Sequence, residues 1–252
     1  MRDIDRHLYT AAQVRESDRR AIEMCGISGH ELMRRAAASC WAVIRERSPV
    51  AATIAIVCGP GNNGGDGYEI ARLATQDNWI VHVYALDGVP QAGDAQRAYA
   101  AWCAEGGVTV PFSGVLADAD WVVDAMFGTG LARVLADDAV RAVNAIAASR
   151  ARGAKVLAVD VPTGLDATTG DVLSGIAVQA DITVSFIGQK LGLHTGCGPA
   201  ISGERRFDDL AVPATAYGGI EPLARLQLDV DLQAALPPRA RDAHKGDHGH
   251  VL

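Results

Sequence analysis

From residue 50 onward, short apolar runs alternate with longer stretches that have a helical pattern. This alternation is typical of β-α units and predicts a mostly parallel sheet with helices on both faces. Aromatic residues make up only 5% of the chain, so the core would be built from Val, Ile, Leu and Ala, as in other helix-covered parallel sheets. The predicted strands are residues 53–58, 80–86, 121–125, 155–160 and 182–187, and the predicted helices between them are residues 65–76, 94–105 and 137–149.

The beginning of the chain carries a different pattern. Residues 10–24 and 30–47 have the periodicity of two helices, and residues 26–29 contain the glycines that separate them. A length of 252 residues suits one large domain, or one domain with a short appendage. The sequence therefore predicts a three-layer α/β/α Rossmann-like fold with a mostly parallel central sheet and two N-terminal helices.

Net charge and cysteine content disfavour several classes of protein. The net charge of −7 gives no support for nucleic-acid binding. The five cysteines form no Cys-x-x-Cys pair and are odd in number, which disfavours a disulfide framework or a zinc site. The sequence contains neither a signal-peptide pattern nor a long apolar run. We therefore expect a cytoplasmic protein that binds neither nucleic acid nor membrane.

Three predicted strands end in loops rich in glycine and polar residues. These loops are residues 59–67, 124–130 and 160–166. In open α/β sheets, ligands bind beyond the carboxyl ends of the strands. If the sheet is parallel, the three loops lie at one edge and can form a common site.

The first loop matches the Gly-x-Gly-x-x-Gly dinucleotide fingerprint, and Asp87 follows Gly64 at about the distance of a ribose-binding acid. Asp66 argues against the ordinary version, because a carboxylate in the first turn of the helix would repel a pyrophosphate. Side-chain oxygens at Asn62, Asn63 and Asp66 suit hydroxyls, amides or a cation. The alternative is that these side chains only cap the helix.

Asp124 and Asp160 stand at the ends of two apolar strands. A single such aspartate is more often a turn or capping residue, but two at equivalent strand ends indicate a site. Asp124, Asn63 and Thr163 offer only oxygen ligands, which a hard cation prefers, and K⁺ suits a set with one carboxylate. For Lys190, in the loop after the last predicted strand, a solvated side chain is the default expectation.

The loops together carry a family resemblance. The chain resembles the YjeF N-terminal family, the NAD(P)H-hydrate epimerases, over residues 8–215. The resemblance lies in the segments YTAAQVR (residues 9–15), GPGNNGGDG (59–67), DAMFGTGL (124–131) and DVPTGLD (160–166), in this order. The last residues, 244–252, resemble the opening of the dehydratase domain that follows the epimerase in bifunctional members.

The resemblance implies a domain division and an activity. Residues 1–215 would form the epimerase domain, 216–243 a linker and 244–252 the truncated start of a dehydratase-like domain, so we expect no dehydratase activity. The implied reaction is a nucleotide repair step in which the R and S forms of hydrated NADH or NADPH (NADHX, NADPHX) interconvert at C6 of the nicotinamide ring. A homodimer is also implied.

The resemblance also implies roles for single residues. Asp160 is the candidate general acid/base, and Asn63, Asp124 and Thr163 would bind K⁺. The family more often has Ser at the last position, and Thr keeps the hydroxyl. The implied substrate contacts are Asn62, Asn63, Gly64, Gly65, Asp66, Gly128, Thr129, Gly130, Leu131, Ala132, Arg133, Val134 and Asp160.

Two other functions compete with this one. A NAD-dependent oxidoreductase would use the same glycine loop for intact NAD, although Asp66 and the two asparagines count against it. A non-catalytic binding or scaffold module with this fold is the second alternative. A degenerate module would be expected to lose the polar loop or the strand-end aspartates, and this sequence retains both.

Overall fold

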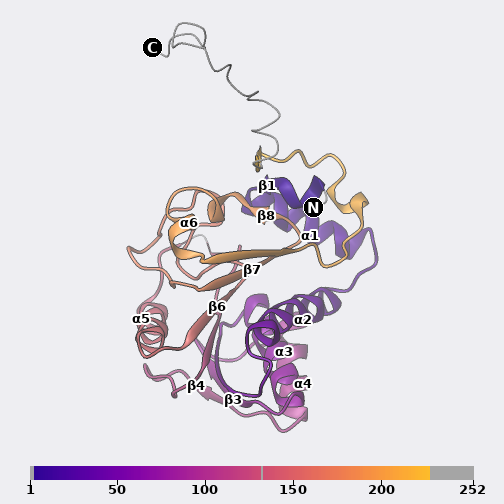
Figure 1. The fold of residues 1–252 in the computed structure, drawn as a ribbon. Coiled ribbons are helices and arrows are strands. Elements are labelled where there is room, and N and C mark those ends of the chain that lie inside the picture. Colours follow the sequence, from indigo (N-terminus) through magenta and orange to yellow (C-terminus); the bar gives the residue numbers. More distant parts are fainter. Residues whose placement is uncertain (1–2, 132, 228–252) are drawn as a thin grey trace, which may run out of the picture.

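The computed structural model describes residues 3–131 and 133–227 (Figure 1). Ala132, an expected substrate contact, lies outside the described residues. So do residues 228–252, which hold most of the predicted linker and the predicted start of a second domain.

A seven-stranded sheet forms the centre of the molecule, and each strand in it runs parallel to its neighbours. The predicted parallel sheet is therefore confirmed. The strands, in spatial order, are β4 (Thr109–Pro111), β3 (Ile80–Ala85), β2 (Thr53–Cys58), β5 (Trp121–Ala125), β6 (Lys155–Val159), β7 (Ile182–Phe186) and β9 (Glu204–Asp208).

Helices cover both faces of this sheet, which confirms the three-layer arrangement (Figure 1). On one face pack α2 (Gly29–Arg47), α3 (Asn62–Gln76) and α4 (Gly93–Ala104); on the other packs α5 (Asp137–Ala151). Side chains alternate along the strands: in β2, Ile54 and Ile56 belong to the core under the first set of helices, and Ala55 and Val57 to the core under α5.

The two N-terminal helices begin at capping residues. In α1 (Ala11–Glu23), the Thr10 hydroxyl accepts from the backbone N–H of Gln13, whose side chain accepts from the Thr10 N–H in return. Ser28 caps α2 through the N–H of Glu31. Such side chains satisfy backbone donors that a helix start leaves free, so they set where each helix begins.

A second, three-stranded sheet joins distant parts of the chain. Its central strand, β1 (His7–Tyr9), runs parallel to β8 (Gln189–Lys190) and antiparallel to β10 (Ala224–Arg225). The sequence analysis did not predict this sheet. Ala216 is buried, and the chain as far as residue 227 returns to the first strand, so the beginning of the segment predicted as a linker packs on the α/β core. The division into domains stays a prediction.

The remaining short elements are η1 (Asp3–Arg6), η2 (Leu191–Leu193), α6 (Gly198–Ile201) and η3 (Ala214–Tyr217). In the part of the chain that the structure describes, none of the helices combines the length and apolar character that crossing a bilayer requires.

Candidate active site

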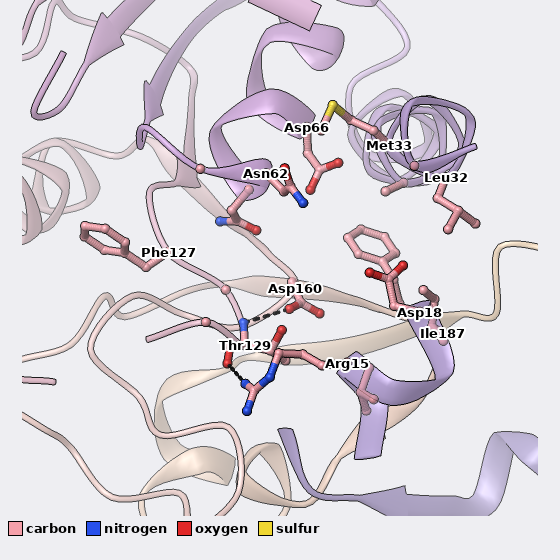
Figure 2. Close-up of a pocket in the computed structure, with 18 of the residues that line it drawn as sticks. Arg15, Asp18, Leu32, Met33, Asn62, Asp66, Phe127, Thr129, Asp160 and Ile187 are labelled. Atoms are coloured by element: carbon pink, nitrogen blue, oxygen red, sulfur yellow. Dashed lines mark hydrogen bonds between the residues drawn. The ribbon is translucent and has the colours of Figure 1, made fainter. Parts of the chain in front are cut away.

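A cavity of about 510 Å³ opens at the carboxyl edge of the main sheet (Figure 2). Its walls include residues 60–63 and Asp66 from the first loop, residues 126–131 from the second, and Asp160 from the third. The expected convergence of the three loops is therefore confirmed. Helices α1 and α2 supply the opposite wall, including Asp18 and Met33.

Glycines allow the first loop to turn directly into α3. Gly61 precedes the helix, and among the described residues no side chain caps it, so the capping alternative for the two asparagines has no support. A Cβ on Gly64 would overlap the carbonyl oxygen of Gly59, and one on Gly65 would lie 2.6 Å from the Met33 sulfur. These two glycines are buried and stand outside the described cavity lining, and their predicted contact with substrate stays a prediction. Asn62, Asn63 and Asp66 reach the cavity.

Asp160 occupies a strained position at the end of β6. Its φ of 69° lies in the left-handed region, which costs a non-glycine residue free energy unless its surroundings hold it there. Its N–H donates to the Val184 carbonyl at 2.8 Å, and its Oδ2 accepts from the Thr129 N–H at 3.1 Å. Asp160 is only 9% exposed. Its carboxylate is therefore fixed in direction at the cavity wall, as a reacting group would need to be.

Lys190 is the charge partner of Asp160. Its Nζ lies 2.5 Å from Asp160 Oδ1 and donates to the Phe186 carbonyl at 2.7 Å, and the residue is 1% exposed. The expectation of a solvated lysine was wrong. Lys190 is held in β8, which pairs with β1 at Tyr9 and thereby encloses the side chain.

Two more carboxylates face the same cavity (Figure 2). Burial raises the pKa of Asp66 well above its ordinary value, and the negative charges of Asp160, Asp18 and Glu69 raise it further, while Lys190 opposes them. Burial also raises the pKa of Asp18, with Lys190 lowering it and Asp160 raising it. Asp94 also belongs to the described lining, which thus holds four carboxyl groups against the Lys190 ammonium and the Arg15 guanidinium. Such environments favour the neutral form of some carboxyls.

Asp18 was not predicted from the sequence, although the helical pattern of α1 could have identified it. Val14, Ser17 and Ala21 are the buried residues of α1, and Asp18 lies at the helical spacing that places a charge on that face. Arg15 on the same helix donates to the Thr129 carbonyl at 2.6 Å, which connects α1 with the second loop.

Asp124 and Thr163 form a fully buried oxygen cluster behind the cavity. The Thr163 hydroxyl and N–H donate to the Asp124 carboxylate at 2.7 and 2.8 Å, and the Met126 N–H adds a third bond at 3.2 Å. Burial raises the pKa of Asp124 to about 6 against the lowering effect of these bonds. Asn63 Nδ2 is buried and finds no hydrogen-bond partner within the described chain. This donor set of carboxylate, hydroxyl and amide oxygens fits a hard cation.

The second loop divides into two parts. Gly128, Thr129, Gly130 and Leu131 line the cavity, and a Cβ on Gly128 would lie 2.8 Å from Asp160 Oδ2 and 3.0 Å from Asn63 Oδ1. Glycine at this position therefore leaves room between these two polar groups. Arg133 and Val134, also expected to contact substrate, are exposed and stand outside the lining that the described residues define.

Comparison with known proteins decides the family. The family described as "YjeF-related protein N-terminus" matches residues 29–192. This chain belongs to that family.

Relatives of this YjeF-related chain carry names that describe NAD(P)H-hydrate chemistry. The bifunctional NAD(P)H-hydrate repair enzyme Nnr of Coxiella burnetii is 39% identical over 250 residues, which cover 97% of this chain and 50% of the relative. The NAD(P)H-hydrate epimerase of Limosilactobacillus fermentum is 37% identical over 195 residues, covering 77% of this chain and 92% of the relative. The YjeF-related chain thus spans about half the length of the bifunctional relative and nearly all of the epimerase.

A solved structure agrees on the fold. The crystal structure of the yeast protein ynu0 (YNL200c) superposes with a TM-score of 0.73 and covers 88% of this chain and 99% of the yeast chain, at 18% sequence identity. This likeness supports the YjeF-type architecture and, at that identity, nothing about chemistry.

Proposed function

We propose that this chain is an isomerase that interconverts the R and S forms of hydrated NADH and NADPH at C6 of the nicotinamide ring. The observation that carries the proposal is Asp160, a strained and nearly buried carboxylate fixed at the wall of a cavity where three strand-end loops meet. The names of two relatives, NAD(P)H-hydrate epimerase and bifunctional NAD(P)H-hydrate repair enzyme, support the substrate class.

The polar residues of the cavity suit the reacting end of such a substrate. The side chains of Asn62 and Asn63 and the backbone of residues 128–131 would bind the hydrated ring and its carboxamide, and Asp160 would exchange protons with it. Because α3 begins at Asn62, Asp66 lies in its second turn and not in the first turn expected from the sequence. Its carboxyl group still lines the cavity and disfavours a pyrophosphate there, which counts against a NAD-dependent oxidoreductase. Gly64, Gly65, Arg133 and Val134 would act by shaping the two loops.

We propose K⁺ as the cofactor, held by Asn63, Asp124 and Thr163. The support is the fully buried Asp124 carboxylate, the Thr163 hydroxyl bonded to it, and the Asn63 amide oxygen, which faces Gly128 in the neighbouring wall. When bound, K⁺ would supply positive charge next to Asp124 and tie the three loops together. Proton transfer would remain the work of the cavity's own side chains.

The test uses the separated R form of NADHX with K⁺ present, and follows formation of the S form by chromatography. We expect wild-type protein to equilibrate the two forms much faster than the spontaneous reaction, and Asp160→Asn to lose this acceleration. Asp138→Asn is the matched control, because Asp138 is a half-exposed aspartate of α5 that pairs only with Arg141 among its described neighbours. A well-folded wild type without acceleration would overturn the enzyme assignment and favour a binding module.

We also include in the proposal a homodimer, which the family resemblance implies, and a cytoplasmic location. Light scattering on purified protein tests the oligomeric state, and cell fractionation tests the location.

A further inference from the structure

The proposed epimerisation can follow two chemical routes, and the charges in the cavity discriminate between them. In one route the hydroxyl leaves C6 and the ring becomes an iminium ion. In the other, the bond between C6 and N1 breaks and the ring opens to an aldehyde. Which of these routes the site supports is a question that rests on the proposed function.

The described side chains of the cavity supply little positive charge. The proposed K⁺ would lie beside the buried Asp124 carboxylate, which offsets its charge. Asp18, Asp66, Asp94 and Asp160 all line the cavity, whereas Lys190 already contacts both the Phe186 carbonyl and Asp160. Arg15, the other cation in the lining, donates to the Thr129 carbonyl near the mouth and is exposed. A group of fixed carboxyls at a desolvated centre stabilises positive charge that develops in a substrate and destabilises negative charge.

Asp66 and Asp160 reach into this cavity from different walls. Asp66 projects from α3 and Asp160 from the end of β6, and Figure 2 shows the open space between their carboxyl groups. Their environments also differ. Asp160 has the Lys190 ammonium 2.5 Å from Oδ1 and accepts a backbone N–H at Oδ2. Asp66 is surrounded by Asp18, Glu69 and Asp160, and its raised pKa favours the neutral acid.

We propose that Asp66 and Asp160 form an acid–base pair across the two faces of the nicotinamide ring, with Lys190 positioning Asp160, so that epimerisation proceeds through an iminium ion. Neutral Asp66 gives its proton to the C6 hydroxyl. The C6–O bond breaks with its electron pair going to oxygen, water leaves, and the N1 lone pair forms the N1=C6 bond. Asp66 is then a carboxylate that faces the cation it helped to create.

Water adds to the opposite face in the second half of the reaction. Asp160 takes a proton from this water as the new C6–O bond forms, and the electron pair of the N1=C6 bond returns to nitrogen. The configuration at C6 is now inverted. A proton passes from Asp160 to Asp66 through solvent before the next turnover, and the reverse reaction uses the two carboxyls in exchanged roles.

Ring opening fits this site less well. That route begins by removing the proton of the C6 hydroxyl, which develops negative charge on oxygen beside the carboxyl groups of the lining. The described cation nearest to the reaction space, Lys190, is held on Asp160 and on a backbone carbonyl. Lys190 is thus a positioning residue: it acts on Asp160 instead of touching the substrate.

Oxygen exchange with solvent separates the two routes. The R form of NADHX is incubated with wild-type enzyme in water enriched in oxygen-18, and the S form is collected in the earliest part of the reaction and weighed by mass spectrometry. The iminium route puts one solvent oxygen on C6 at each inversion, so we expect labelled S form from unlabelled R form. Ring opening retains the original oxygen, so unlabelled S form would overturn the inference and leave the epimerase function standing. If the wild type does not accelerate epimerisation at all, the proposed function itself fails.

Substitutions test the roles of the two flanking residues. We expect Asp66→Asn to slow epimerisation by ~10²–10⁴-fold, with Asp138→Asn again as the control. A folded Asp66→Asn protein with the wild-type rate would overturn the acid role.

Lys190→Met removes the charge beside Asp160, whose other charged neighbours are Asp18 on α1 and Asp66 on α3. We expect kcat to fall while KM for NADHX stays close to the wild-type value, because the Asp160 carboxylate has lost the group that positions it. A purely structural lysine would lower the yield of folded protein without this split between kcat and KM. Lys190→Gln serves as the second variant, because its amide can still donate to the Phe186 carbonyl if Lys190→Met does not fold.

Discussion

Asp124 and Asp160 follow neighbouring strands of one sheet and end up with opposite roles. Asp124 is fully buried, and its carboxylate accepts three hydrogen bonds from the protein. Asp160 has a left-handed backbone, lies at the cavity wall, and shares its carboxylate between a backbone N–H and an ammonium. The comparison teaches that a strand-end aspartate contributes to the architecture when its oxygens are satisfied internally, and becomes available for chemistry when one side is left to the cavity.

The largest effect should come from Asp160→Asn. Asparagine tolerates the left-handed backbone, so the substitution tests charge more than conformation. We expect a ~10²–10⁴-fold loss of epimerase rate, because the proton-transfer group is gone. The buried Lys190 ammonium would also lose its countercharge, at a cost of about 3–5 kcal/mol of unfolding free energy. Kinetics measure the loss of rate, and urea unfolding measures the loss of unfolding free energy. An unchanged epimerase rate would contradict the catalytic role that distinguishes Asp160 from Asp124.

We expect K⁺ to stabilise the folded protein by binding beside Asp124. Saturating K⁺ at about 100 times its dissociation constant would add about 2.7 kcal/mol to the unfolding free energy. Thermal unfolding in K⁺ is compared with Li⁺ at equal ionic strength, and Asp124→Asn should abolish the difference. Equal melting temperatures in both salts for the wild type would contradict the cation site.

Thr163 allows a matched pair of substitutions at the same cluster. Thr163→Val keeps the shape but removes a hydroxyl that donates to Asp124 at 2.7 Å, and we expect a loss of about 1–3 kcal/mol because a buried acceptor loses a partner. Thr163→Ser retains the hydroxyl and should cost less than Thr163→Val. Chemical denaturation measures both, and similar losses in the two variants would mean that packing matters here more than the hydrogen bond.

We expect the smallest effect from Asp66→Asn, which should raise the free energy of unfolding. The pKa of Asp66 is raised in the folded protein, so between the ordinary and the raised value the folded state binds more protons than the unfolded state. Stability therefore falls as pH rises through this window, and Asp66→Asn should remove that decline. Each ~1 kcal/mol recovered would raise the melting temperature at neutral pH by about 2–4 °C. A variant less stable than wild type at pH 7 would contradict the burial penalty.

The sequence predicted the centre of the fold better than its borders. Strands such as 53–58 and 121–125 are buried on both faces, so their continuous apolar runs identify them. The edge strands escaped detection. β4 is three residues long and contains Pro111, and β9 begins with Glu204 and two arginines. Short, charged or proline-containing strands are typical of sheet edges, where they hinder pairing with other chains, and the same features hide them from pattern analysis.

The candidate site was also predictable only in part. Loops at the ends of predictable strands could be located, because a parallel sheet sends all its carboxyl ends to one edge. The direction of each side chain could not be predicted from the sequence. Gly64 and Gly65 share a motif with Asp66 but turn away from the cavity. Lys190 is a buried ion-pair partner of Asp160, and its strand pairs with β1, which is distant in sequence.

The pairing of β1 with β8 also has a consequence for the order of folding. Tyr9 and Lys190 are register partners, so this contact closes a loop of most of the described chain. Contacts between such distant segments form late, because the entropy of closing the loop must be overcome before they add stability. A chain that has already assembled its seven-stranded sheet would still lack a fixed lysine beside Asp160. The protein should thus gain its structure before it gains its activity, and regain of activity should lag behind regain of secondary structure during refolding.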